Sequence, residues 1–257
     1  MTAGTLEPPA TDPDPRSGLR WWREVLFILV FYGLYTLVRD LRGVQPVSRL
    51  QAYTNAQRII DAERFFGIFH EGRIQSWFLP WHGVVRVLDD FYGTAHFVVT
   101  LVALVYLFRS RPERYGLWRN TLAFTTAIAL LGFAFFPLMP PRLLPPSFHF
   151  VDTLQAVGGL WSFDSGPMHG VSNQYAAMPS LHFAWSMWCV LSLAPTIRSV
   201  PAKVLLWCYP LATLLCIVVT GNHYILDAVG GGAALAMGLW LARMVQGARE
   251  TRAAVAS

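Results

Sequence analysis

Two histidine-containing stretches carry the residue types and spacing that could do chemistry. His182 follows Pro179 and Ser180 at the start of an apolar run, and His223 lies four residues before Asp227. Residues four apart share one face of a helix, so the carboxylate can orient the imidazole as a base or a nucleophile. The Ser180 hydroxyl and the free N–H groups of a helix start favour an anion. A phosphate group would suit this place.

Both stretches border runs that are apolar enough to cross a bilayer, where ionisable side chains are costly unless they share a polar cavity. The 257 residues are 54% hydrophobic and 14% charged, and their mean hydropathy is +0.40. This composition excludes an ordinary soluble domain and predicts a polytopic membrane protein. Continuous apolar runs favour an all-α chain over an outer-membrane barrel. The net charge of +5 comes from arginines beside these runs, so we expect no nucleic-acid partner.

Six transmembrane helices are expected, in one catalytic membrane domain over residues 21–245. Residues 1–20 and 246–257 are expected to form tails, and the first is expected to be disordered because it is rich in Pro, Asp, Thr and Ala. The three cysteines all lie in apolar runs and are expected to have packing roles. The expected spans are 22–38, 90–108, 120–138, 176–195, 203–220 and 222–242.

Basic residues gather in alternate connections between the expected spans. They precede the first span, separate the second from the third and the fourth from the fifth, and follow the sixth. The positive-inside rule therefore predicts that both termini are cytoplasmic. It also predicts that Arg142, His182 and His223 lie near the extracytoplasmic face of the plasma (inner) membrane.

Residues 39–89 separate the first two expected spans. Ile59, Ala62, Phe66 and Phe69 recur there at helical spacing, which predicts an amphipathic helix lying in the membrane interface. The alternative is an extra pair of short soluble helices.

The other long connection, residues 139–175, opens with prolines around Arg142. Its aromatic residues and glycines suit a lid over the site on the extracytoplasmic side. His149 and His169 lie in this connection, but nothing in their setting assigns them to the site.

These residues give the chain a resemblance to the membrane branch of the type 2 phosphatidic acid phosphatase superfamily, over roughly residues 85–242. The family motif Pro-Ser-Gly-His is similar to Pro179-Ser180-Leu181-His182, and its histidine with an aspartate four residues later is similar to His223 and Asp227. The proline-flanked Arg142, the stretch from Phe91 to His96 and Leu181 resemble the inositol-phosphorylceramide-synthase-like subgroup.

One departure from the family pattern concerns phosphate binding. The phosphatases usually have Ser-Arg six to seven residues before the motif histidine, where this chain has Cys216 and Ile217. One phosphate-binding arginine is therefore missing. The departure bears on the reaction type more than on the fold.

The resemblance implies phosphoryl transfer in two steps, with no cofactor and no metal. His223 attacks phosphorus to form a phosphohistidine, and His182 protonates the departing alcohol. Asp227 orients His223 and stabilises its cationic form. Water then resolves the intermediate in a phosphatase, and a second alcohol resolves it in a transferase.

Four further residues are candidates for contacts with the substrate. Arg142 is the candidate for the phosphate oxygens, because a guanidinium is a planar fork of donors, and the alternative is a loop arginine at the membrane surface. Ser180 either donates to the phosphate or caps its helix. Tyr92 and His96 either contact the substrate or form a buried polar pair within their span.

The expected partner is a membrane lipid substrate, with a polyol or lipid alcohol as acceptor. The subgroup resemblance favours transfer of phosphate, with inositol phosphate chemistry as one form of it. The alternative is hydrolysis of phosphatidate or a polyprenyl phosphate or diphosphate. A two-histidine, one-carboxylate metal site and a non-enzymatic transporter or scaffold are remoter alternatives. The lipid, the acceptor and the oligomeric state stay open at this point.

Overall fold

The computed structural model describes residues 20–22, 24–26, 29, 33, 48–158 and 174–256. Within these residues the chain is helical, and an isolated bridge joins Leu138 to Ala176. Most of the expected span 22–38 and nearly all of the 1–20 tail lie outside the described residues. The same holds for part of the expected lid, including His169.

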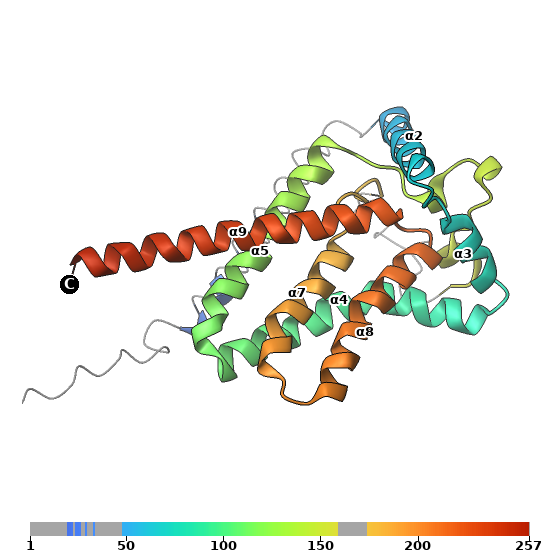
Figure 1. Ribbon diagram of the computed structural model, residues 1–257. Coiled ribbons are helices and arrows are strands. Elements are labelled where there is room, and N and C mark those ends of the chain that lie inside the picture. Colours follow the sequence, from blue (N-terminus) through green and yellow to red (C-terminus); the bar gives the residue numbers. More distant parts are fainter. Residues whose placement is uncertain are drawn as a thin grey trace, which may run out of the picture.

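A helical bundle forms the body of the protein, and the short helix α7 lies at its centre (Figure 1). Helix α7 packs against all four of the longer helices, while α5 and α9 pack along each other. Trp188 of α7 is fully buried and donates a hydrogen bond to the Trp118 carbonyl of α5, at 2.9 Å. The bundle helices are α4 (His82–Ser110), α5 (Pro112–Phe135), α7 (Leu181–Leu193), α8 (Val200–Val219) and α9 (Ile225–Ala256).

Three of these helices, α4, α8 and α9, are long and apolar enough to cross a membrane. Helix α5 covers the expected span 120–138 only as far as Phe135. Helix α7 has 13 residues, or about 20 Å, so it is shorter than a bilayer core of about 30 Å. It starts at Leu181 rather than at 176 because Pro179 and Ser180 form the turn before it. The described part of the chain is thus all-α, with three helices suited to cross a membrane, while six spans stay a prediction.

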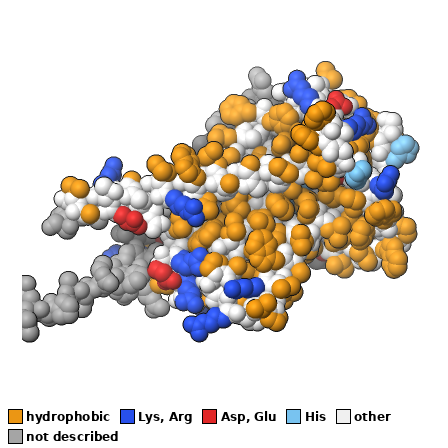
Figure 2. Space-filling model, in the orientation of Figure 1, with side chains coloured by type: hydrophobic (Ala, Val, Ile, Leu, Met, Phe, Trp, Pro, Cys, Tyr) orange, Lys and Arg blue, Asp and Glu red, His pale blue; other side chains and the backbone are white. Residues whose placement is uncertain are grey.

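The surface of the bundle is largely hydrophobic, as suits a lipid environment. Hydrophobic side chains cover most of the face seen in Figure 2, and exposed ones include Leu205 and Leu211 of α8. Basic side chains lie at the lower edge, where the α4–α5 and α7–α8 connections lie in Figure 1, and at the opposite, upper right end. This separation of apolar and basic surface is typical of helices that cross a bilayer.

Two short helices, α2 (Arg49–Phe65) and α3 (Glu71–Phe78), stand at the other end of the bundle (Figure 1). Helix α2 buries Ala52, Ala56, Ile59 and Ile60, whereas Phe66 at its end is 65% exposed. Ile59 therefore packs inside the protein, while Phe66 faces outward. A pair of short helices is present, and a position in the membrane interface stays a prediction.

The segment after α5 packs against α2 and crosses the end of the bundle. Leu138 and Met139 join the buried residues of α2 and Tyr224 in one hydrophobic cluster. The chain then forms the short helices η1 (Pro141–Leu143), η2 (Pro146–Phe148) and α6 (Thr153–Ala156). This path brings the part of the expected lid that the structure describes next to the turn between α8 and α9.

Candidate active site

The turn between α8 and α9 carries His223. Helix α8 ends at Val219, and Gly221 adopts φ = +66°, a left-handed conformation that favours glycine. The backbone N–H of His223 then returns to the Ile217 carbonyl at 3.1 Å. Helix α9 begins only at Ile225. His223 therefore precedes the helix that carries Asp227, whereas the sequence spacing predicts that both lie on one helix.

Asp227 nevertheless reaches His223 from the first turn of α9. His223 Nδ1 and Asp227 Oδ2 lie 3.2 Å apart, and the Tyr224 backbone N–H donates to the same oxygen at 3.0 Å. Both side chains are buried, at 3% and 0% exposure. His223 Nε2 is buried and has no hydrogen-bond partner among the described residues. With Nδ1 held by the carboxylate, Nε2 is the nitrogen that can attack a substrate.

Ser180 is the N-cap residue of α7, and His182 lies in the first turn of that helix. Ser180 Oγ accepts a hydrogen bond from the Phe183 N–H at 3.4 Å, and its backbone N–H donates to the Asp227 carbonyl at 2.9 Å. Of the two roles weighed for Ser180, the structure contains the helix cap, and phosphate binding stays a prediction. The cap places His182 beside the start of α9.

The two candidate imidazoles converge although they come from different elements. Their ring centroids lie 5.5 Å apart, with the ring planes 62° apart. From α4, Tyr92 stacks on His182 at 4.1 Å and His96 contacts it edge-on at 4.2 Å. Tyr92 also lies 6.3 Å from the His223 ring. The two histidines are close enough to act on one phosphoryl group, with Tyr92 and His96 as neighbours of His182.

Arg142 lies against the same turn as His223. Its backbone N–H donates to the Gly221 carbonyl at 2.8 Å, and its Nε donates to Asn222 Oδ1 at 2.9 Å. One terminal nitrogen forms an ion pair with Asp152 at 2.8 Å. The Arg142 side chain is only 14% exposed. Asn222 and Asp152 thus hold the guanidinium against this turn, whereas contact with a phosphate stays a prediction.

Further polar residues, for which the sequence motifs predict no role, support this arrangement. Thr153 Oγ1 donates to Asp89 Oδ1 at 2.8 Å, which links α6 to α4 next to Asp152. Asn222 Nδ2 donates to Thr220 Oγ1 at 2.9 Å and so fixes the amide that accepts from Arg142. The position of Asn222 next to His223 is a signal that the sequence offered. Asp89 and Thr153 carry no such signal, because they meet only in the fold.

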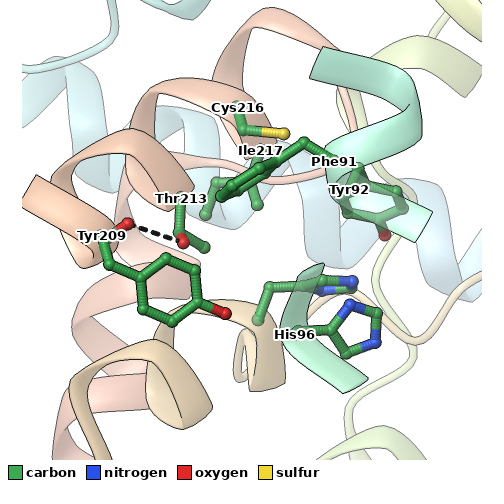
Figure 3. Close-up of a pocket in the computed structure, with 8 residues that line it drawn as sticks. Phe91, Tyr92, His96, Tyr209, Thr213, Cys216 and Ile217 are labelled. Atoms are coloured by element: carbon green, nitrogen blue, oxygen red, sulfur yellow. Dashed lines mark hydrogen bonds between the residues drawn. The ribbon is translucent and has the colours of Figure 1, made fainter. Parts of the chain in front are cut away.

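A small cavity adjoins His182 between α4 and α8 (Figure 3). Tyr92 and His96 line it from α4, while Tyr209 and Cys216 line it from α8. Cys216 Sγ contacts the Leu88 carbonyl oxygen at 3.1 Å, so the position where the family usually has Ser-Arg is used for packing and cavity lining. The complete lining comprises Phe91, Tyr92, His96, His182, Tyr209, Thr213, Cys216 and Ile217.

A metal site was one alternative for the histidine pair. Among the residues that the structure describes, no group of three or more His, Cys, Asp or Glu side chains is placed to hold a metal ion. Asp227 Oδ2 is instead engaged by His223 and by a backbone N–H. The geometry therefore gives the proposed two-histidine, one-carboxylate metal site no support.

The sequence profile of the PAP2 superfamily matches residues 57–241. The chain belongs to the PAP2 superfamily. The match begins well before residue 85, so it includes α3 and the end of α2. No curated protein and no solved structure matched the chain.

Membership in the PAP2 superfamily supports a phosphatase-type enzyme in a membrane. The superfamily expected from the sequence motifs is thereby confirmed. The match does not separate the inositol-phosphorylceramide-synthase-like subgroup from the other PAP2 proteins. The substrate and the fate of the phosphoryl group are therefore matters for a proposal.

Proposed function

We propose that this PAP2 protein is an integral membrane enzyme that cleaves a phosphoester or pyrophosphate bond in a lipid-linked substrate through a phosphohistidine at His223. The observation that carries the proposal is the state of His223. Its Nδ1 is held by Asp227, and its Nε2 is buried without a partner in the described residues, beside His182. An oriented imidazole with one nitrogen available is suited to nucleophilic catalysis.

The first step forms a bond between His223 Nε2 and phosphorus and breaks the bond from phosphorus to the leaving oxygen. That oxygen takes a proton from His182, which acts as general acid. The phosphorylated imidazole is cationic, and the Asp227 carboxylate stabilises it through the Nδ1–H. In the second step an incoming hydroxyl loses its proton to His182 and bonds to phosphorus. The bond to His223 then breaks and the enzyme returns to its starting state.

Phosphoryl transfer concentrates negative charge on the non-bridging oxygens, so fixed donors are required. Arg142 is the proposed donor, because Asn222 and Asp152 hold its guanidinium beside the turn that carries His223. Ser180 is proposed to favour phosphate binding at the helix start that it caps. Tyr92 and His96 are proposed contacts of the leaving or accepting alcohol, since both adjoin His182.

The acceptor of the phosphoryl group distinguishes two forms of the proposal. The motifs that resemble the inositol-phosphorylceramide-synthase-like subgroup favour transfer. The transferred group would be phosphate or inositol phosphate, and the acceptor a polyol or a lipid alcohol. Membership in the PAP2 superfamily favours hydrolysis of phosphatidate or a polyprenyl phosphate as the second candidate. Neither form requires a metal ion for the steps above, because His182 and His223 carry the proton and the phosphoryl group.

The site is proposed to face the extracytoplasmic side of the plasma membrane, with both termini in the cytoplasm. Helix α5 begins beside Arg111 and Arg114, and a Cβ at Gly132 near its other end would meet the ring of Pro179. The arginines of the α4–α5 connection and the turn before His182 therefore lie at opposite ends of α5. The positive-inside rule would place the arginine end in the cytoplasm.

Incubation of the purified protein with a panel of labelled lipids tests the proposal. The panel contains phosphatidate, a polyprenyl diphosphate and phosphatidylinositol, each with and without inositol or another polyol. We expect at least one of these lipids to yield a phosphorus-containing product with the wild type but not with His223→Ala. Free phosphate as the sole product, whatever acceptor is supplied, would reject transfer and retain hydrolysis. No turnover of any lipid would reject the proposed function.

A further inference from the structure

Two glutamates from the short helices α2 and α3 meet the start of α9, outside the group of residues described above. Glu63 Oε1 accepts a hydrogen bond from the Leu226 N–H at 2.7 Å, and Glu71 Oε1 accepts one from the Ile225 N–H at 3.0 Å. Both glutamates are fully buried. The first N–H groups of a helix have no partner within it and attract negative charge. The two carboxyl groups thus hold the first turn of α9, directly after His223.

The second oxygens of the two carboxyl groups carry a further constraint. Each Oε2 is buried and accepts no hydrogen bond from a donor in the described part of the chain. The two carboxyl groups accept from adjacent N–H groups of one helix turn, so they lie next to each other. Two ionised carboxylates this close in a buried site would repel, and one shared proton removes the repulsion.

The groups around Glu63 also favour its protonated form. Burial, followed by the neighbouring Glu71 carboxyl, raises the pKa of Glu63 to about 9. The titratable groups that face the pair from α9 and the turn before it are Asp227 and Tyr224, and Tyr224 also faces Tyr53 of α2. None of these side chains is basic. The raised pKa of Glu63 therefore favours a proton held between the two carboxyl groups.

We propose that Glu63 and Glu71 form a carboxylic acid–carboxylate pair that shares one proton, and that this pair positions His223 and Asp227 for reaction by holding the first turn of α9. The proposal rests on the proposed function of His223. Glu63 and Glu71 act here as positioning residues, because each contacts the α9 backbone rather than the reacting group.

Gln75 shows that α3 also holds the other side of the turn that carries His223. Its Nε2 donates to the Val219 carbonyl at the end of α8 and to the Val151 carbonyl, both at 3.0 Å. Its Oε1 accepts from the Val151 N–H at 2.9 Å. Since Val151 precedes Asp152, the partner of Arg142, α3 contacts both chain segments that flank the site. Displacement of α2 or α3 would therefore move His223, the proposed nucleophile, together with Arg142, which is proposed to bind the phosphate.

Four variants test the pair. Glu63→Gln keeps the acceptor for Leu226 and places an N–H donor where the shared proton lies, so we expect kcat within about threefold of wild type at pH 7. Glu63→Ala removes the acceptor, and we expect kcat to fall about tenfold or more with a smaller change in KM. Glu71→Ala should behave like Glu63→Ala. Glu113→Gln, at an exposed glutamate of α5, is the matched control and should match wild type.

The pH profile is the measurement that separates positioning from general support of the fold. In the wild type, kcat should fall as the pH rises through about 9, because Glu63 then loses the proton that the pair shares. In Glu63→Gln this alkaline decline should shift to higher pH or disappear. A decline that is the same in both proteins, or a Glu63→Ala variant with unchanged kcat, would overturn the proposal.

Thermal unfolding without substrate provides a test that does not depend on turnover. The raised pKa means that the folded protein binds a proton that the unfolded chain releases above about 4.5. This stabilisation is complete below that pH and is lost as the pH rises through about 9. Tm should therefore fall more steeply over this range in wild type than in Glu63→Gln. Equal slopes of Tm against pH in the two proteins would reject the shared proton. Absence of lipid turnover would instead reject the proposed function.

Discussion

The backbone N–H of Ser180 donates a hydrogen bond to the carbonyl of Asp227 at 2.9 Å. This single contact joins the start of α7, which carries His182, to the first turn of α9, which holds His223. The two helix starts can approach this closely because Gly231 has no side chain. A Cβ at Gly231 would overlap the Ser180 carbonyl oxygen. The relative position of the two histidines thus depends on a backbone contact between distant parts of the sequence.

Gly231→Ala should therefore lower both stability and activity. We expect a loss of about 1–3 kcal/mol in the free energy of unfolding, since the added methyl group meets backbone rather than a flexible side chain. Gly247→Ala on the same helix is the control, because nothing lies within 4 Å of its Cβ position. Alanine there should stabilise the helix by about 0.5–1 kcal/mol. Thermal unfolding in detergent checks both values, and equal effects of the two variants would contradict the close approach.

His223→Ala should abolish turnover while leaving the protein folded. The expected loss in kcat is at least about 10³-fold, because the phosphoryl group then has no nucleophile. Asp227→Asn should cost about 100-fold or more, since Nδ1 loses the carboxylate that stabilises its positive charge. Labelled substrate should leave an acid-labile phosphoryl group on the wild type and none on His223→Ala.

The matched control for that experiment is His70→Ala, at an exposed histidine before α3 whose side chain makes no capping hydrogen bond. It should retain wild-type turnover and labelling. Near-normal rates in His223→Ala would reject this residue as the nucleophile.

His182→Ala should slow the reaction in a way that depends on the leaving group. An alkoxide needs a proton as it departs, so we expect a loss of about 10²–10⁴-fold with an alkyl phosphate ester. A nitrophenolate leaves without a proton, so the loss with a nitrophenyl ester should be much smaller. Steady-state kinetics with both esters measure the difference. Equal losses with the two esters would reject His182 as the general acid.

The histidine pair could be predicted because its motifs carry information within a few residues. The spacing of His223 and Asp227 predicts their contact, and Ser180 before an apolar run predicts a helix start at His182. The helix assignment of His223 was wrong in detail. Gly221 turns the chain after α8, and Asp227 reaches back from the first turn of α9 to a residue outside the helix.

The support of the site could not be predicted in the same way. Glu63 and Glu71 look like ordinary solvent-facing charges in an amphipathic segment, and their partners Leu226 and Ile225 are more than 150 residues away. A signal was present in α2, where Glu63 lies four residues after the buried Ile59 and so shares its face. Hydrophobic periodicity alone does not show whether such a carboxylate is buried. Only the fold supplies the N–H groups that allow its burial.

Arg142→Ala should weaken binding of the phosphoryl group more than it destabilises the protein. We expect kcat/KM to fall about 100-fold or more, and Arg142→Lys to recover only part of it, because an ammonium lacks the planar fork. Asp152→Asn keeps the shape of the ion-pair partner but removes its charge, so its effect should be smaller. Competitive inhibition by vanadate measures the phosphate site. Unchanged vanadate inhibition in Arg142→Ala would indicate a purely structural role for the arginine.

Cysteine labelling in intact cells tests the orientation of the site. Ser147 beside the Arg142 segment and Glu113 at the start of α5 are both exposed, and Cys208→Ser removes the exposed native thiol from the background. The positive-inside rule predicts that Ser147→Cys reacts with a membrane-impermeant maleimide in intact cells. Glu113→Cys should react only after permeabilisation. Reaction of both positions from the same side would contradict the proposed topology. Reversed accessibility would place the site, and therefore its lipid headgroup, on the cytoplasmic face.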